Sequence, residues 1–324
     1  MTVSRDSLER HQISISFAAT LLGIWGAFAL PGQTWRALIN PTLAALLYVT
    51  FLQVPIVELR RGWTERRFLA ALGTTNFLIA PLAATLLTLT LPDEPAVLRL
   101  GVLLVLLAPC IDYVVAFTHL AHGNARLLLA ATPLLLVAQM ISLPLFIGLV
   151  LGQDAARLIR AEPFLQALFW LIMVPLALTA ATQFWAARQT AGRHMVRALS
   201  WLPVPLTAMT LLVIVAAVLP DVFAQADEVA RLVPLYAAFT LAMPLAGALV
   251  GRGFALAAPA ARALAFSGAT RNSLVVLPVA FALPEAGLLL PAIIVTQTLV
   301  ELALMPLLLH AIPKLLPGRS HIRS

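Results

Sequence analysis

Long apolar segments follow one another along the whole chain, and they limit the folds open to it more than any other feature. A helix needs about 20 mostly apolar residues to cross the hydrocarbon core of a bilayer. Ten segments come close to this length: 13–30, 38–57, 68–91, 97–121, 127–151, 164–185, 198–219, 232–250, 263–283 and 287–312. The sequence therefore predicts an all-α membrane protein with ten transmembrane helices, whose backbone polar groups are paired within each helix.

The composition agrees with this prediction and excludes several other classes of protein. Hydrophobic residues make up 61% of the 324 residues and charged residues 11%, against about 25% charged residues in a soluble domain. The net charge is +7, but the basic residues are scattered through short loops, which argues against nucleic-acid binding. A single cysteine excludes an internal disulfide and a cysteine-rich zinc site. No cofactor is expected, and membrane lipid is the predicted surroundings.

The positions of lysine and arginine predict the orientation of the helices. Fifteen of the 21 basic residues fall on one side of the predicted membrane, five fall on the other, and Arg271 lies inside a segment. The larger set is Arg5, Arg10, Arg60, Arg61, Arg66, Arg67, Arg126, Arg188, Arg193, Arg197, Arg252, Arg262, Lys314, Arg319 and Arg323, and the smaller set is Arg36, Arg99, Arg157, Arg160 and Arg231. Because cytoplasmic loops carry the excess of basic residues, both termini are predicted to be cytoplasmic, in the plasma (inner) membrane of a bacterium.

The ten segments divide into two halves of five, residues 1–151 and residues 152–324, within one transporter unit. An odd number of helices per half gives the two halves opposite orientations in the membrane. Inverted repeats of this kind are typical of secondary transporters. A monomer and a homodimer both remain open.

Two of the segments are interrupted at corresponding places in the two halves. Ala108–Asp112 breaks the apolar run of the fourth segment, and Ala269–Ser273 breaks that of the ninth. Pro109 lacks an amide proton and should end its helix, whereas Asn272 and Ser273 are good caps for a new helix. Paired broken helices are the best sequence indication of a transporter's binding site, although a structural kink is the alternative in a chain with 23 prolines.

The first break contains the only cysteine, Cys110, which has two interpretations. A lone cysteine is usually a small buried hydrophobic residue. Here it adjoins the predicted start of a half-helix, where a thiol is more easily ionised, and a thiolate is a soft ligand for thiophilic centres. We therefore include Cys110, Arg271, Asn272 and Ser273 among the predicted substrate-binding residues.

Four polar residues are candidates for coupling transport to an ion: Asp112, Gln139, Gln297 and Glu301. Gln297 and Glu301 stand four residues apart, so they share one helix face. Arg271 needs a partner at this depth, because an unpaired charge in a membrane is costly. Its expected partners are Asp112 and Glu301.

Several of these residues also carry a resemblance to a known family. Leu107–Cys110, followed by His119–Ala125, resembles the fourth span of the Acr-type arsenite permeases, and Thr298–Ala303 resembles their last span. Those permeases belong to the bile acid:sodium symporter superfamily. The resemblance implies ten spans in an inverted five-plus-five repeat with two crossing broken helices. It also implies export of trivalent arsenic, with Cys110 as the arsenic ligand and Glu301 as the last-span glutamate.

The sequence departs from that family at the ninth segment, where Arg271–Leu274 replaces an Asn-Asn-x-Glu pattern. Two transport hypotheses therefore stay open: an arsenite exporter driven by proton exchange, and a sodium- or proton-coupled symporter of an organic anion. A membrane enzyme is the third hypothesis. It lacks support, because neither an H-E-x-x-H nor a G-x-S-x-G motif is present.

Overall fold

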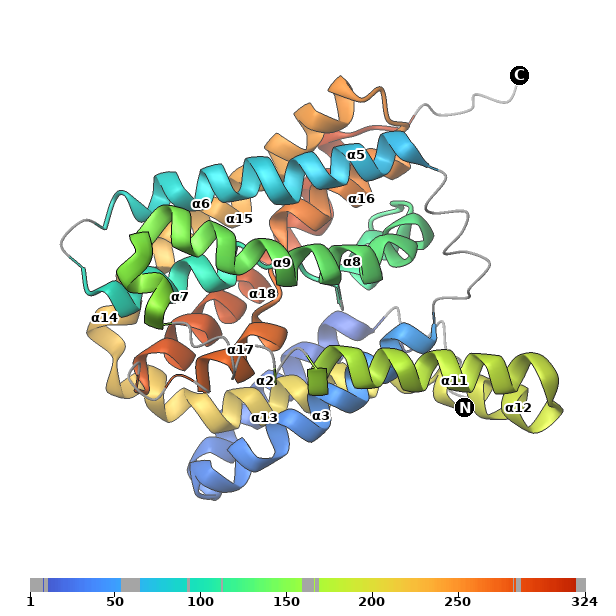
Figure 1. The fold of residues 1–324 in the computed structure, drawn as a ribbon, viewed down its shortest axis with the longest axis horizontal. Helices are drawn as coiled ribbons and strands as arrows, with labels where there is room; N and C mark the ends of the chain where they lie inside the picture. The colour runs from blue at the N-terminus through green and yellow to red at the C-terminus, as the bar shows by residue number, and fades with distance from the viewer. Residues whose placement is uncertain are drawn as a thin grey trace. The chain divides into compact units, whose positions relative to one another are not determined.

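The computed structural model describes residues 8, 11–53, 65–91, 94–111, 113–158, 166, 169–281, 283 and 287–318. These residues are almost entirely helical, and the described part of each of the ten predicted segments falls mainly on one helix or on consecutive helices (Figure 1). Five stretches are long and apolar enough to cross a membrane individually: Gly32–Leu52, Arg66–Thr88, Pro203–Ala224, Ala226–Gly253 and Leu289–Leu315. A bent pair within residues 125–151 makes a sixth. The chain is therefore a multi-pass membrane protein.

The chain forms two compact units. The first combines Met1–Pro55, Arg157–Val229 and Leu274–Val295. Its helices are α2 (Gln12–Ala29), α3 (Gly32–Leu52), the π-helical turn η2 (Phe169–Met173), α11 (Val174–Arg188), α12 (Thr190–Leu199), α13 (Pro203–Ala224), most of α14 (Ala226–Ala230), nearly all of α17 (Ser273–Phe281) and the start of α18 (Leu289–Leu315).

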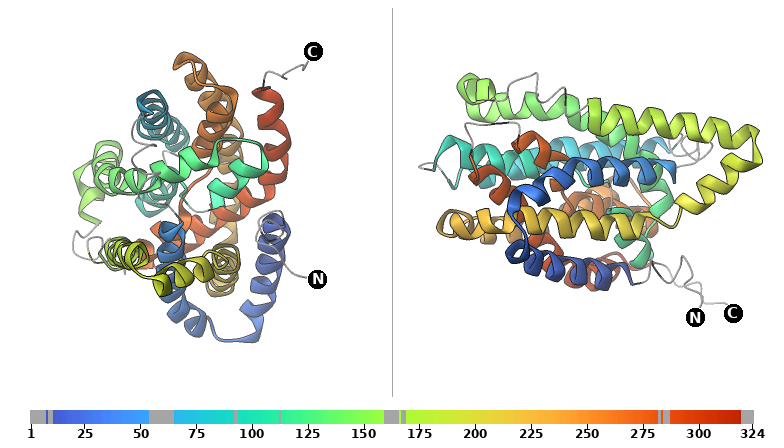
Figure 2. Two further views of the ribbon diagram at one scale, coloured as in Figure 1. Left: turned by 90° about the vertical axis from the view of Figure 1, so that its right-hand side faces the viewer. Right: turned by 90° about the horizontal axis from the view of Figure 1, so that it is seen from below.

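Helix α13 packs along α2 and α3 in the first unit (Figure 2). The packing of α13 on α2 is close at Gly23, where a Cβ atom would lie 2.8 Å from the carbonyl oxygen of Leu212. Small residues allow such backbone approach between membrane helices. Across the same unit, Arg36 of α3 forms an ion pair of 2.7 Å with Asp221 of α13.

Two boundaries in the first unit differ from the sequence prediction. Helix α3 begins at Gly32 rather than at 38, directly after Pro31 at the N-cap, so a polar turn containing Arg36 belongs to the helix. Residues 190–199, which precede and overlap the start of a predicted segment, form the separate helix α12 with Arg193 and Arg197. Both differences have one cause, since the prediction followed apolar residues and these turns are polar.

The second unit combines Ile56–Ala156, Ala230–Ser273 and Thr296–Ser324. Its helices are α5 (Arg66–Thr74), the π-helical turn η1 (Thr75–Ile79), α6 (Ala80–Thr88), α7 (Ala96–Leu106), α8 (Tyr113–Leu120), most of α9 (Ala125–Leu158), α15 (Val233–Gly253), α16 (Ala258–Ala269) and the remainder of α18. Helices α15 and α16 pack closely, since a Cβ on Gly247 would lie 2.9 Å from Cα of Ala265.

Prolines explain two irregular helices in the second unit. Pro81 follows the π-helical turn η1, where the N–H of Ala80 bonds to the carbonyl oxygen of Thr75. Proline removes a helical hydrogen bond and favours such a bulge. Helix α9 bends by 48° between Gln139 and Ile141, four residues before Pro144, whose ring clashes with a carbonyl in that position.

Candidate functional site

The chain leaves helical geometry at both predicted breaks. Helix α7 ends at Leu106 and α8 begins at Tyr113, while α16 ends at Ala269 and α17 begins at Ser273. We call residues 107–111 and 270–272 the paired breaks, because they form a short antiparallel bridge between Pro109 and Arg271. The position of both interruptions is as the sequence predicted, whereas Asp112 lies outside the described residues.

Two main-chain hydrogen bonds hold the paired breaks together. The N–H of Cys110 donates to the carbonyl oxygen of Thr270 over 3.2 Å, and the N–H of Asn272 donates to that of Ala108 over 2.7 Å. Each break therefore supplies partners for backbone groups that the other leaves without a helical bond. This pairing keeps non-helical backbone inside protein, as a membrane requires.

The carboxylate of Glu301 lies at the centre of a buried network. Glu301 is completely buried in α18. Its Oε2 accepts the main-chain N–H of Arg271 at 2.8 Å and the Nε2 of Gln297 at 2.7 Å, and its Oε1 accepts the hydroxyl of Tyr113 at 2.9 Å. One side chain thus connects α18 to the second break and to the first residue of α8.

The guanidinium of Arg271 is also completely buried. Its acceptors are the carbonyl oxygens of Leu106 (3.2 Å), Ser267 (3.0 Å) and Gly268, and Oδ1 of Asn76 (3.3 Å). The ring of Phe239 lies 5.1 Å from its Cζ, within cation–π range. The buried Nε has no hydrogen-bond partner among the described residues.

These contacts test one of the two expected partners of the Arg271 guanidinium. Glu301 contacts the main-chain N–H of Arg271, and no described carboxylate lies within ion-pair distance of the guanidinium. The charge is instead met by main-chain carbonyls that the breaks have left without helical partners. The second expected partner, Asp112, lies outside the described residues.

The four predicted substrate-binding residues come together at the paired breaks, and all are buried. The hydroxyl of Tyr113 lies 3.3 Å from the carbonyl oxygen of Arg271. The hydroxyl of Thr298 in α18 donates to Oγ of Ser273 over 2.6 Å. Their role in binding a substrate stays a prediction.

Gln139 stands apart from this network in the described contacts. It is completely buried at the bend of α9, and neither its Nε2 nor its Oε1 has a partner in the part of the chain that the structure describes. The hydroxyl of Ser142 donates to the main-chain oxygen of Gln139 over 3.3 Å. A buried amide of this kind is costly without a ligand or water, so its predicted role in ion coupling remains open.

The sequence reading missed three members of the network: Asn76, Tyr113 and Ser267. The amide nitrogen of Asn76 donates to the hydroxyl of Ser267 over 3.0 Å, while its oxygen accepts from Arg271. Asn76 lies in the π-helical turn η1, and such turns are frequent at functional sites. A single asparagine inside the apolar segment 68–91 was the signal that could have indicated it.

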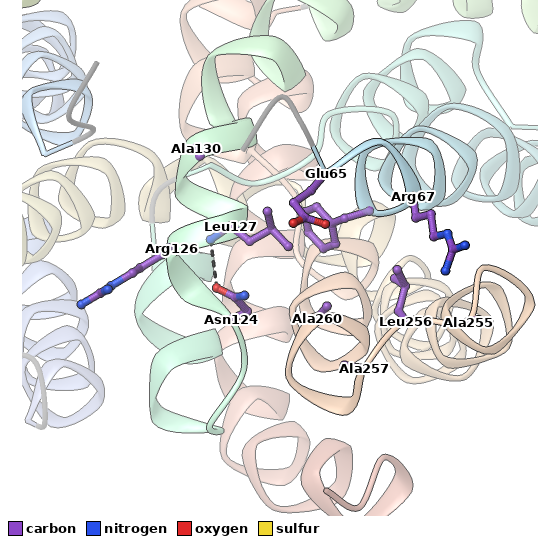
Figure 3. Close-up of a pocket in the computed structure, with 11 residues that line it drawn as sticks. Glu65, Arg67, Asn124, Arg126, Leu127, Ala130, Ala255, Leu256, Ala257 and Ala260 are labelled. Atoms are coloured by element: carbon purple, nitrogen blue, oxygen red, sulfur yellow. Dashed lines mark hydrogen bonds between the residues drawn. The ribbon is translucent and has the colours of Figure 1, made fainter. Parts of the chain in front are cut away.

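A pocket of about 530 Å³ lies elsewhere in the second unit, and none of the paired-break residues lines it. Its lining includes Glu65, Phe68 and Asn124, whose Oδ1 accepts the N–H of Leu127 at 3.1 Å and so caps α9. Figure 3 shows Arg67 and Arg126 at its rim with their side chains directed away from each other. The described contacts give this pocket no connection to Glu301.

Comparison with known proteins then identifies the family. Residues 40–225 match the Sodium Bile acid symporter family. The chain belongs to this family. It is therefore a secondary transporter and not an enzyme. The matched range contains the first break with Cys110 and ends before Arg271 and Glu301. No curated protein matches the chain.

Proposed function

We propose that this member of the Sodium Bile acid symporter family exports trivalent arsenic, as arsenite, in exchange for protons. The supporting observation is the placement of Cys110. The only cysteine of the chain is buried in the first break and is bonded through its main chain to Thr270 of the second. A ligand bound to a thiol at the junction of two broken helices would contact one break directly and affect the other through this main-chain bond.

The proposed binding step is a reversible exchange of ligands on arsenic. The sulfur of Cys110 displaces one hydroxide of arsenous acid, an S–As bond forms, an As–O bond breaks, and the thiol proton leaves with the hydroxide as water. One sulfur provides weak capture, as transport requires, whereas sequestration would need several soft ligands. Because arsenous acid is neutral at pH 7, export against a gradient needs a second, charged species.

Glu301 is the residue that we propose for proton coupling. As a carboxylate it accepts three hydrogen bonds, two of them at Oε2. A proton on either oxygen would compete with one of these donors, so protonation would loosen the link between α18 and one of the breaks. Asp112 is the second proposed proton carrier, and Gln297 and Gln139 are proposed to assist.

The proposed membrane arrangement is that of the sequence analysis. It has ten spans in a five-plus-five inverted repeat, with residues 1–151 and 152–324 as the halves and both termini in the cytoplasm of a bacterial cell. In this arrangement α7 with α8 and α16 with α17 each form one broken span. The helices found in the described part of each of the ten predicted segments support it.

A symporter of an organic anion is the second candidate, which the family's name favours. In that case Arg271, Asn272 and Ser273 would contact the anion. The geometry makes this less favourable, because the terminal nitrogens of Arg271 already donate to four protein oxygens. Among the described contacts, its Nε and one of the two hydrogens on Nη1 would remain for a substrate.

Transport in membrane vesicles tests the proposal. Everted vesicles should accumulate arsenite when a proton gradient is imposed, and vesicles with Cys110→Ser should not. Right-side-out vesicles with taurocholate, under proton and sodium gradients separately, form the second arm. Uptake of taurocholate together with unchanged arsenite levels would contradict arsenite export and favour the organic-anion candidate.

A further inference from the structure

Four oxygen atoms converge on the guanidinium of Arg271 from three elements of the second unit. They are Oδ1 of Asn76 in η1, the carbonyl oxygen of Leu106 at the end of α7, and the carbonyl oxygens of Ser267 and Gly268 near the end of α16. We call this set the oxygen cage. All four residues that supply these oxygens belong to helices that the structure describes.

The breaks themselves create three of these acceptors. In a continuous helix, the carbonyls of Leu106, Ser267 and Gly268 would accept from the amides four residues later. Those amides bond elsewhere: Cys110 to Thr270, Arg271 to Glu301, and Asn272 to Ala108. The carbonyls of the cage are therefore free to hold a cation.

Such a cage has the chemistry of an alkali-cation site. Main-chain carbonyls and amide oxygens are hard ligands that replace the hydration shell of a small cation. The C-terminal ends of α7 and α16 add partial negative charge. In transporters, unwound backbone and half-helix C-terminal ends coordinate sodium ions or protons.

We propose that Arg271 is a tethered cation that permanently occupies the oxygen cage, in the place where a sodium ion would otherwise fit. A diffusing ion enters and leaves in each transport cycle and so delivers the energy of its gradient. A guanidinium fixed to the chain cannot leave, so this position delivers none. The inference rests on the proposed function in one respect, since without a sodium ion at this position the proton is the proposed coupling ion. It does not depend on the identity of the substrate.

Thermal unfolding of the purified full-length protein in detergent tests the inference without any transport assay. The midpoint is measured in sodium, lithium, potassium and choline chloride at equal ionic strength. We expect equal midpoints for the wild type. Arg271→Ala should be destabilised in choline and recover in sodium in a saturable manner, by roughly 5 °C at high occupancy.

Arg262 provides the matched control. Its guanidinium also donates to main-chain carbonyls, those of Ala121, His122 and Leu316, but its site is partly exposed. Arg262→Ala should lower the midpoint equally in all four salts. Arg271→Lys, which keeps a charge in the cage, should be insensitive to the choice of salt.

Three outcomes would overturn the inference. The first is sodium-specific stabilisation of the wild type, which needs no variant to measure. The second is sodium-specific stabilisation of Arg271→Lys, the variant to use if Arg271→Ala does not accumulate. The third is an equal loss of stability of Arg271→Ala in every salt. Because arsenite is absent throughout, failure of arsenite export in vesicles would leave these results unaffected.

Discussion

The main-chain N–H of Arg271 donates to Oε2 of Glu301 over 2.8 Å, and both residues are completely buried. The bond uses the backbone of Arg271, while its guanidinium contacts carbonyls near the ends of α7 and α16. The Glu301 carboxylate and the Arg271 guanidinium are thus both buried near each other, but the described contacts show no direct ion pair between them. Desolvation makes such pairs sensitive to the loss of either member.

Replacing Glu301 by glutamine should remove proton coupling and lower stability. Glutamine keeps the shape but has one acceptor oxygen where glutamate has two, so it cannot accept from Arg271, Gln297 and Tyr113 together. Losing a charge-assisted hydrogen bond costs about 2 kcal/mol. We expect Glu301→Gln vesicles to lose the acceleration of arsenite export by a proton gradient, as measured by arsenite accumulation at several external pH values.

A carboxylate outside the buried network gives the control for that experiment. Glu94 pairs with Arg231 over 3.1 Å, and the side chains are 19% and 61% exposed, respectively. Exposed pairs contribute little, so Glu94→Gln should leave the response to the gradient unchanged. An unaltered gradient response in Glu301→Gln vesicles would exclude Glu301 as the coupling group.

The ion pair of the first unit should behave asymmetrically. Asp221 is only 5% exposed in its side chain and Arg36 34%, so removing the arginine leaves a buried carboxylate without its partner. Arg36→Ala should lower the stability by about 2 kcal/mol, more than Asp221→Asn does. The double variant should cost less than the sum of the two, as a double-mutant cycle of thermal unfolding would show. Additive effects would mean that the pair contributes nothing.

The sequence predicted the positions of both breaks because their residues are conspicuous in an apolar run. Pro109 cannot continue a helix, and Arg271 is the only basic residue deep within a segment. The sequence predicted that the two breaks correspond to each other, but not which of their atoms form hydrogen bonds. The antiparallel bridge joins main-chain atoms, which carry no residue-specific signal.

The partners of Arg271 could not be predicted for a related reason. Carboxylates are the usual partners of a buried arginine, whereas the described contacts of the Arg271 guanidinium are carbonyls left without helical partners and one amide oxygen from Asn76. A carbonyl that has lost its helical hydrogen bond cannot be recognised from the sequence, because every residue has one. By contrast, the shared helix face of Gln297 and Glu301 followed from their spacing of about one helical turn, and it is confirmed by the 2.7 Å hydrogen bond between them.

The orientation of the helices is open to a direct test. Reporter fusions after Gly62 and Gly192 should indicate the cytoplasm, and fusions after Asp93 and Asp227 should indicate the external side. The reason is the excess of basic residues near the first two positions. Alkaline phosphatase and green fluorescent protein make a complementary pair of reporters. A single inverted loop would contradict the ten-span arrangement.

The substrate proposal depends most on Cys110, and its variants separate chemistry from packing. Serine is nearly the same size as cysteine and keeps a polar group, but it cannot form the S–As bond. Cys110→Ser and Cys110→Ala should both accumulate in the membrane at normal levels, since a small change at a buried site costs about 1 kcal/mol. Both should abolish arsenite accumulation in everted vesicles and arsenite resistance of cells.

Asp112→Asn provides the comparison for these two variants. It removes a carboxyl group two residues after Cys110 in the sequence with almost no change in shape, so arsenite binding should persist while the pH dependence of export flattens. Binding is measured by protection of Cys110 from maleimide labelling in the presence of arsenite. If Cys110→Ser cells keep their resistance, the thiol mechanism is wrong, and the organic-anion candidate becomes the one to test.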